Sequence, residues 1–319
     1  MEEEKLKYNR AALDVIDEVK KVIIGKDECV RKVMEAILAG GHILIEDIPG
    51  VGKTSMALAF AKAMGINQNR VQFTPDVLPT DIIGFSMYRK EIDKFEYQPG
   101  AVMCNLFLAD EINRTSPKTQ SALLEVMEEE TVTVDGITRE VPKPFHVIAT
   151  ENPIGSVGTQ MLPESQLDRF MICVYIGYPN KDDELTILMS RDNNNPMSQV
   201  VPVIQGESLI NMQEEVKTVF MHKTVYEYIV NLVDATRNSE LIELGISPRG
   251  ALPIAAMARA EAYLEDREYV IPSDVENIFI DVALHRVVLS SKGKLNNLSV
   301  NDVLKDVLAK VKKPSPVQT

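Results

Sequence analysis

The stretch EDIPGVGKTSMALAF, from Glu46 to Phe60, constrains the fold of this chain more than any other segment. Its centre, PGVGKT, is typical of a loop that wraps the phosphates of a nucleotide. The residues before it, 42–46 (HILIE), form a short apolar run that predicts a buried parallel strand, and residues 54–65 have helix-forming composition. A strand, a glycine loop and a helix in this order predict a parallel α/β sheet that carries a nucleotide site.

The loop residues have separate expected roles. Backbone N–H groups and the helix N-terminus supply partial positive charge, and Gly50 and Gly52 allow the backbone to approach phosphate oxygens closely. The amine of Lys53 is expected to reach the β- and γ-phosphates, and the hydroxyl of Thr54 is expected to bind Mg²⁺. The predicted nucleotide-binding residues of this segment are Asp47, Pro49, Gly50, Val51, Gly52, Lys53, Thr54 and Ser55.

Asp47 departs from the phosphate-loop signature G-x-x-x-x-G-K-[ST], which has glycine at its first position. That position requires an unusual backbone angle more than it requires a missing side chain, and aspartate tolerates left-handed geometry better than most residues. Because Asp47 follows the strand directly, its carboxylate can point away from the phosphates. We therefore expect Asp47 to adopt a left-handed conformation and the loop to bind nucleotide.

The segment NLFLADE, residues 105–111, supplies the second half of such a site. It is a buried-strand candidate that ends in two carboxylates. Asp110 is expected to bind the metal ion directly or through water, and Glu111 is expected to orient and polarise the attacking water. The alternative is a pair of carboxylates that simply face solvent at the end of a strand.

Other strand and hairpin signals fill out the first half of the chain. Strands are predicted at residues 71–73, 145–150 and 173–178. A two-residue turn at Asp135-Gly136 inside residues 131–141 predicts a hairpin. Residues 85–100 are predicted to form a second pair of short strands around a charged turn. Helices are predicted over residues 28–39 and 118–129. Ala12, Val15, Ile16 and Val19 have the spacing of one buried helix face.

The composition changes near Tyr178-Pro179. Helices are predicted beyond that point over residues 181–191, 207–218, 222–238, 248–265, 272–285 and 299–312. Ser273, which precedes Asp274 and Glu276, is a plausible helix start. We therefore divide the chain into an α/β core, residues 1–179, and a smaller helical domain, residues 180–319.

Composition excludes some classes of protein. A net charge of −13 argues against a general nucleic-acid binder, because such affinity depends on Lys and Arg contacts with phosphates. No run approaches the ~20 apolar residues that a membrane span requires. The acidic start lacks the features of a secretory signal, and the three cysteines are scattered. These observations favour a cytoplasmic protein.

Four blocks together resemble the MoxR family of AAA+ ATPases over nearly the whole chain: PGVGKT, LADEINRTSPKTQSALLEVMEE, IATENPI and LPESQLDRFMICVYIGYP. The resemblance implies the fold class α/β, with an AAA+ P-loop core whose parallel sheet is sandwiched by helices and a smaller all-α lid domain. It places the chain in the helix-2-insert branch. The two predicted hairpins then correspond to insertions that project toward a ring face or pore.

The resemblance also implies roles for further residues. Asn152 matches sensor 1, which holds the attacking water against the γ-phosphate, although an asparagine that caps a strand end is the alternative. Arg169 matches the arginine finger and Arg249 matches sensor 2, and both are expected to act on the site of a neighbouring subunit. Backbone atoms of Ile24 and Gly25 are expected to contact adenine. Arg114 and Glu164 are expected to be interface or supporting residues.

The implied activity is hydrolysis of ATP with Mg²⁺ by a ring, expected to be a hexamer. The implied role is chaperone-like: remodelling, maturation or activation of a client protein, often one with a von Willebrand factor A domain. Three alternatives stay open at this point: a magnesium-chelatase-like ATPase subunit, an MCM-type helicase, and an ATP-gated scaffold with little turnover.

Overall fold

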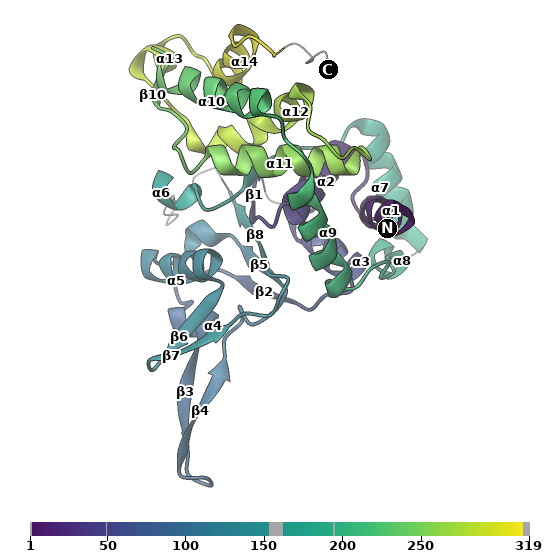
Figure 1. Cartoon of the computed structure of the whole chain (residues 1–319). Helices are drawn as coiled ribbons and strands as arrows, with labels where there is room; N and C mark the ends of the chain where they lie inside the picture. Colours follow the sequence, from purple (N-terminus) through teal and green to yellow (C-terminus); the bar gives the residue numbers. More distant parts are fainter. Residues whose placement is uncertain (1, 49, 153–161, 194, 315–319) are drawn as a thin grey trace.

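The core of the protein is a five-stranded parallel sheet in the order β2-β5-β8-β1-β9 (Figure 1). The computed structural model describes residues 2–48, 50–152, 162–193 and 195–314. The strands are β1 (Ile43–Glu46), β2 (Gln68–Gln72), β5 (Leu106–Asp110), β8 (His146–Glu151) and β9 (Ile172–Val174). The predicted parallel α/β sheet is confirmed. Strand β9 ends four residues before the predicted Tyr178, because the chain leaves the sheet and turns through a left-handed Gly177.

Alternating side chains of the strands face two different helical layers. Ile43 and Ile45 pack into a core shared with α1 (Glu2–Lys20), α2 (Asp27–Leu38) and α3 (Lys53–Ala63). Leu44 packs on the opposite face, in a second core that includes α5 (Pro117–Glu129). This alternation is what a strand covered on both sides requires. The predicted sandwich of helices around the sheet is confirmed.

Helix α1 lies against α2 and α3 rather than projecting from the fold. Ala12, Val15, Ile16 and Val19, the face predicted from spacing, are all buried. The helices predicted over residues 28–39 and 118–129 correspond to α2 and α5, each within one residue at both ends.

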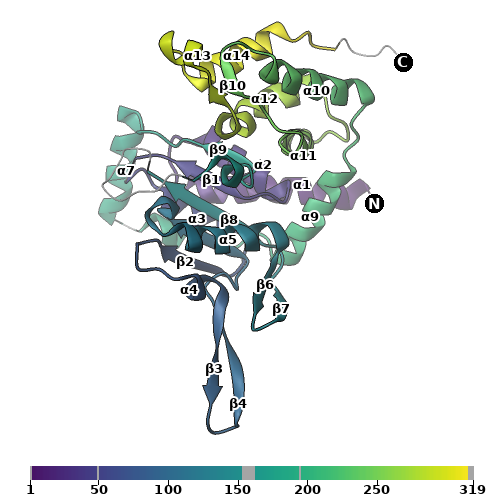
Figure 2. The same cartoon turned by 90° about the vertical axis from the view of Figure 1, so that its left-hand side faces the viewer.

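Two antiparallel hairpins interrupt the α/β pattern. The hairpin of β6 (Thr131–Val134) and β7 (Ile137–Glu140) turns at Asp135 and Gly136, both with positive φ, as predicted. The hairpin of β3 (Gly84–Arg89) and β4 (Lys94–Pro99) follows the short helix α4 (Pro79–Ile83) and extends far from the body (Figures 1 and 2). At its base Gly84 has φ +90°, and a Cβ there would lie 2.4 Å from the carbonyl oxygen of Gln98.

The C-terminal part forms a helical lid above the sheet (Figure 1). Its helices are α10 (Lys223–Arg237), α11 (Ala251–Leu264), α12 (Pro272–Ala283), η2 (Leu284–Arg286), α13 (Ser291–Leu295) and α14 (Val300–Lys310). One short antiparallel pair, β10 (Ile242–Leu244) with β11 (Val288–Leu289), adds strands that the all-helical prediction lacked.

The predicted helix range 272–285 gives the first residue of α12 correctly, but Ser273 is not the residue that starts the helix. The helix begins at Pro272, whose missing N–H suits the first helical position. The Asp274 carboxylate accepts from the backbone N–H of Ile271 at 2.8 Å, which satisfies a free donor before the first turn.

Three helices connect the sheet to this bundle: α7 (Lys181–Asn193), α8 (Pro196–Gln199) and α9 (Gly206–Thr218). Helix α9 contacts α1 and α2 as well as α11, so it packs against both parts of the molecule. The division at residues 179 and 180 stays a prediction. None of the described helices is both long and apolar enough to cross a membrane.

Candidate active site

The glycine loop lies where the sequence predicts it, between the carboxyl end of β1 and the first turn of α3. Gly50 has φ +89° and Gly52 has φ +98°, angles that L side chains rarely adopt. A Cβ built on Gly50 meets nothing within 4 Å, so the loop borders open space. Pro49 lies outside the described residues. The loop therefore has the backbone shape and the free volume that a bound phosphate group needs.

Lys53 is held at the base of this loop. Its side-chain amine donates hydrogen bonds to the backbone carbonyls of Asp47 and Glu151, the latter at 3.0 Å. Burial lowers the pKa of the amine, while the nearby carboxylates of Asp47 and Asp110 oppose that shift. The amine is thus positioned at the loop by one carbonyl oxygen directly after β1 and one in the last residue of the adjacent strand β8.

Asp47 stands at the signature position that usually holds glycine, and its side chain makes two hydrogen bonds with backbone N–H groups. Its carboxylate accepts from the backbone N–H of Ile48 at 2.7 Å and from the backbone N–H of Gly177. The expected left-handed conformation is wrong: Asp47 is not among the described residues with positive φ. The expectation that its side chain turns aside from the phosphates agrees with these bonds. The buried carboxylate ties the glycine loop to the link between β9 and α7.

Asp110 is the meeting point of three side chains. Its carboxylate accepts from the Thr150 hydroxyl at 2.7 Å, from Arg70 Nη2 at 2.7 Å and from the Thr54 hydroxyl at 3.3 Å. A hydroxyl and a carboxylate oxygen side by side are the hard donors that Mg²⁺ prefers. The predicted metal-binding pair, Thr54 and Asp110, is therefore brought together with suitable chemistry.

Glu111 stands in a strained backbone conformation, with φ +58°. Its N–H donates to the Thr150 hydroxyl at 2.9 Å, and its carboxylate pairs with Arg114 at 2.6 Å. Left-handed non-glycine residues are uncommon and gather at functional sites. Arg114, predicted as a supporting residue, is thus a direct partner of the predicted catalytic carboxylate.

Asn152 directly follows β8, so it stands at the same edge of the sheet as Asp110 and Glu111. Its backbone carbonyl accepts from Asn113 Nδ2 at 3.3 Å. The neighbouring Glu151 is buried, and burial together with the charge of Glu46 raises the pKa of its carboxyl to about 7. The position of Asn152 agrees with the role that the resemblance implies.

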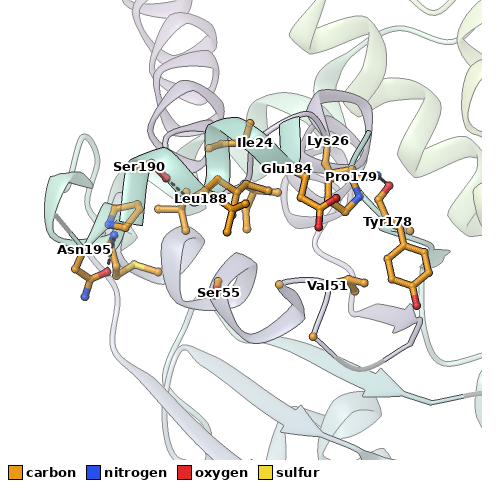
Figure 3. Close-up of a pocket in the computed structure, with 18 residues that line it drawn as sticks. Ile24, Lys26, Val51, Ser55, Tyr178, Pro179, Glu184, Leu188, Ser190 and Asn195 are labelled. Atoms are coloured by element: carbon orange, nitrogen blue, oxygen red, sulfur yellow. Dashed lines mark hydrogen bonds between the residues drawn. The ribbon is translucent and has the colours of Figure 1, made fainter. Parts of the chain in front are cut away.

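A cavity of about 700 Å³ adjoins the glycine loop (Figure 3). Its floor includes Gly50, Val51, Gly52 and Ser55. The side chains of Glu184 and Leu188, on α7, face the loop from the opposite side (Figure 3). This volume is in the range of pockets that hold small-molecule ligands.

Of the two residues predicted to contact adenine, Ile24 lies at the wall of this cavity and Gly25 is not among its lining residues. Ile24 lines it together with Val22 and Ile23. Gly25 has φ +72°, and a Cβ there would lie 1.9 Å from the Asp183 carboxylate. The lack of a side chain at Gly25 therefore allows α7 to approach closely. Apolar walls next to a phosphate loop suit the flat face of a nucleobase.

The two predicted trans-acting arginines converge on one carboxylate. Arg169 Nε lies 2.9 Å from one oxygen of Glu128, and Arg249 Nη1 lies 3.0 Å from the other. The hydrogen bond from Arg169 is the main cause that holds the pKa of the Glu128 carboxyl below its usual value. Glu164, by contrast, begins the short helix α6 (Glu164–Leu167).

This arginine cluster lies at the opposite edge of the sheet from the glycine loop. The backbone N–H of Met171 donates to the carbonyl of His42 at 2.7 Å, and the His42 ring bonds the carbonyl of Met127 at 3.0 Å. His42 precedes the amino end of β1, whereas the glycine loop follows its carboxyl end. Four residues of strand span roughly 13 Å. Arg169 and Arg249 therefore sit apart from the phosphate loop of their own chain.

Two residues of the site were not found from the sequence. Arg70, on β2, pairs with Asp110 although 40 positions separate them. Glu128, near the end of α5, partners both arginines. The available signal for Arg70 was its place directly before the strand predicted at residues 71–73. No local pattern indicated Glu128, because its partners come from distant segments.

Comparisons with known proteins agree with this geometry. Residues 42–172 match the ATPase family associated with various cellular activities, and residues 234–307 match the AAA lid domain. The chain is 44% identical to the YeaC protein of Bacillus subtilis, over 94% of this chain and 93% of that protein. It is 40% identical to Chaperone MoxR1 of Mycobacterium tuberculosis, over 94% of this chain and 81% of that protein.

Solved structures give the same result. A crystal structure of a candidate ATPase from Cytophaga hutchinsonii superposes with a TM-score of 0.91 at 36% identity, covering 98% of both chains. An MCM homologue from Methanopyrus kandleri shares the fold only, at 16% identity and a TM-score of 0.60 over 87% of this chain and 60% of that one. With a glycine loop, an acidic strand end and a helical lid in place, and with relatives named MoxR matched along nearly its whole length, the chain belongs to the MoxR family of AAA+ ATPases.

Proposed function

We propose that this protein hydrolyses ATP to ADP and phosphate with Mg²⁺. The observation that carries the proposal is the convergence of Lys53, Thr54, Asp110 and Glu111 beside an open, glycine-lined cavity. Bound at Thr54 and Asp110, Mg²⁺ would offset negative charge on the phosphates. Lys53 would bind the β- and γ-phosphates, and Asn152 would hold the attacking water.

Glu111 is the residue we assign to orient and polarise that water. Its pairing with Arg114 fixes the carboxylate at the strand end. Full activity then requires the water to take the place of Arg114 at one carboxylate oxygen of Glu111. Such general-base assistance typically contributes 10²–10⁴-fold to a rate.

We propose further that the active form is a ring, in which Arg169 and Arg249 of one copy complete the site of the next. Support comes from the position of both arginines at the edge of the sheet opposite their own glycine loop. A head-to-tail contact between identical copies brings such opposite edges together, and it forms a ring when the rotation between successive copies closes. Six copies are expected from the family resemblance.

The work of the ring is proposed to be chaperone-like action on a client protein. A relative at 40% identity bears the name Chaperone MoxR1, and this is the support for that role. A client with a von Willebrand factor A domain is the expected class. The projecting β3–β4 hairpin, with Phe95 73% exposed, offers an apolar surface for contact. A cytoplasmic location stays a prediction from the sequence.

Steady-state phosphate release from purified protein tests the enzymatic proposal, with sedimentation run with and without ATP. Wild type should release phosphate and sediment faster when ATP is present. The Glu111→Gln variant should bind ATP and assemble but release phosphate at least ~100-fold more slowly. Tight ATP binding with equal, negligible release by both proteins would instead support an ATP-gated scaffold. A pull-down with ATP-loaded Glu111→Gln protein should retain a client that wild type releases.

A further inference from the structure

Glu128 joins the two parts of the molecule through a single carboxylate. It lies on α5, in the core, and one of its oxygens contacts Arg169 Nε at 2.9 Å. The other oxygen contacts Arg249 Nη1, at the start of the lid helix α11, at 3.0 Å. Two guanidinium groups from segments 80 positions apart thus share one anion.

The charge balance of this cluster suits a further anion. Two like charges held close together repel each other, and the carboxylate between them offsets that repulsion. The three groups together keep one positive charge in excess. Each guanidinium has five N–H donors in a planar fork, and Glu128 occupies only one on each side chain. Both arginines therefore retain donors for phosphate oxygens while Glu128 holds them.

The backbone segments that carry the two arginines are also tied together. Asp168 accepts from the Ser247 hydroxyl at 3.0 Å and from Arg286 Nε at 2.6 Å. The buried Arg286 guanidinium also donates to the carbonyls of Phe170 and Met171. The segment before Arg249 is thus bonded to the residue before Arg169. Glu128 adds a further link between the two segments, through the side chains of Arg169 and Arg249.

We propose that Glu128 is a positioning residue that holds Arg169 and Arg249 as one cationic pair for the terminal phosphate of ATP bound to a neighbouring copy. This inference rests on the proposed function, since it assigns the pair to a shared hydrolysis site. Glu128 itself does not touch the reacting atoms. It acts by keeping the two guanidinium groups at a fixed separation before the phosphate binds.

The matched pair of variants is Glu128→Gln and Glu129→Gln, one residue apart on the same helix. Within the described chain, Glu129 forms no ion pair. Glu128→Gln should lower kcat for ATP about 10-fold or more and change KM for ATP less than about threefold, because the pair acts in the transition state. Glu129→Gln should behave as wild type. A kcat for Glu128→Gln equal to or above that of wild type would overturn the proposal.

A double-mutant cycle separates positioning from an independent effect. Once Arg249→Ala has removed one arginine of the pair, adding Glu128→Gln should lower kcat by less than about a further twofold. Both changes disrupt the same arginine pair, so their effects should not multiply. Losses that multiply would show that Glu128 acts without Arg249. Glu128 is one-third exposed, and a thermal melt checks that each variant folds.

A readout that needs no nucleotide keeps this test apart from that of the proposed function. Hydrogen exchange on the nucleotide-free chain follows the N–H groups of Phe170 and Gly250, both of which are hydrogen-bonded. Glu128→Gln should speed exchange in both segments, and Glu129→Gln in neither. Absence of ATPase activity in wild type would refute the proposed function. Unchanged hydrogen exchange in Glu128→Gln would refute the positioning role of Glu128.

Discussion

The two edges of the parallel sheet carry different sets of charged groups. At the carboxyl edge the amine of Lys53 and the guanidinium groups of Arg70 and Arg114 lie among several carboxylates. These carboxylates are Asp47, Asp110, Glu111 and Glu151. At the amino edge two guanidinium groups, Arg169 and Arg249, share the one carboxylate of Glu128.

The carboxylates of one edge and the arginine pair of the other suit different parts of a metal–nucleotide complex. Carboxylates suit a metal ion and an attacking water, whereas guanidinium forks suit the equatorial oxygens of a transferring phosphate. The guanidinium groups at the carboxyl edge, those of Arg70 and Arg114, are paired with Asp110 and Glu111, whereas the two arginines of the amino edge share one carboxylate and keep an unmatched positive charge. The comparison therefore favours a site shared between copies.

Mixing two inactive variants gives the largest predicted effect. Arg169→Ala should reduce ATPase activity by about 10³-fold, as loss of such an arginine does in related hydrolases, and Lys53→Ala should abolish ATP binding. In random rings about a quarter of the sites pair an intact glycine loop with an intact neighbouring arginine, so an equimolar mixture should recover about a quarter of wild-type activity. A mixture as inactive as its components would place both groups in one copy's site.

Replacing Glu111 by Gln should lower kcat by about 10²–10³-fold while leaving ATP affinity within about threefold, because the carboxylate acts on water rather than on the nucleotide. Phosphate release and calorimetric titration measure the two quantities. Glu129→Gln is the control for loss of a surface carboxylate. Loss of ATP affinity in Glu111→Gln would instead give Glu111 a binding role.

Asp47→Ala should weaken ATP binding by about tenfold, because the N–H groups of Ile48 and Gly177 lose their shared acceptor and the loop is no longer tied to the α7 link. Isothermal titration measures the affinity. Asp47→Gly, which restores the usual signature residue, should bring no gain. A higher affinity in the glycine variant would mean that the carboxylate opposes nucleotide binding.

A cluster of charged side chains that belongs to neither edge should affect the stability of the fold and leave catalysis unchanged. Glu35, on α2, is fully buried beside Glu261 of α11, with Arg31 and Lys32 as partners. Burial raises the pKa of Glu35 to about 8. The folded chain then keeps a proton that the unfolded chain releases above pH ~4.5, so stability falls as pH rises toward 8.

Glu35→Gln should flatten this slope, which in wild type reaches at most about 1.4 kcal/mol per pH unit for one group. Denaturant unfolding at pH 5, 6.5 and 8 measures the free energy. Glu265→Gln, which removes an exposed partner of Arg31, should leave the slope in place. A parallel pH profile in Glu35→Gln and wild type would show that Glu35 is ionised throughout.

The sequence allowed the elements of the core to be predicted because their signals are local. Strand β1, the glycine loop and the turn at Asp135-Gly136 each depend on neighbours within a few residues. Alternation of apolar runs with helices indicated a parallel sheet, and the family blocks indicated its likeness to AAA+ proteins. Their order across the sheet was not readable, because it depends on contacts between strands far apart in sequence.

The sequence indicated most of the residues of the site, whereas it did not indicate most of the contacts between them. The partners of Asp47 include a backbone N–H at position 177, and the anion between the two arginines comes from a third segment. No spacing rule connects such positions. The left-handed angle expected at Asp47 occurs at Glu111 instead, where a carboxylate must turn out of a buried strand.

The β3–β4 hairpin leaves the body at a base with almost no conformational latitude, since a Cβ on Gly84 or Gly100 would overlap backbone atoms at 2.4 and 2.2 Å. The Tyr97 hydroxyl bonds the carbonyl of Ile83 at 2.7 Å and braces the same base. Six residues per strand give this arm a reach of roughly 20 Å. A tilt of the core by about 10° would therefore move the tip of the hairpin through roughly 3.5 Å, so a small rotation of the body gives a displacement the size of a side chain at the far end.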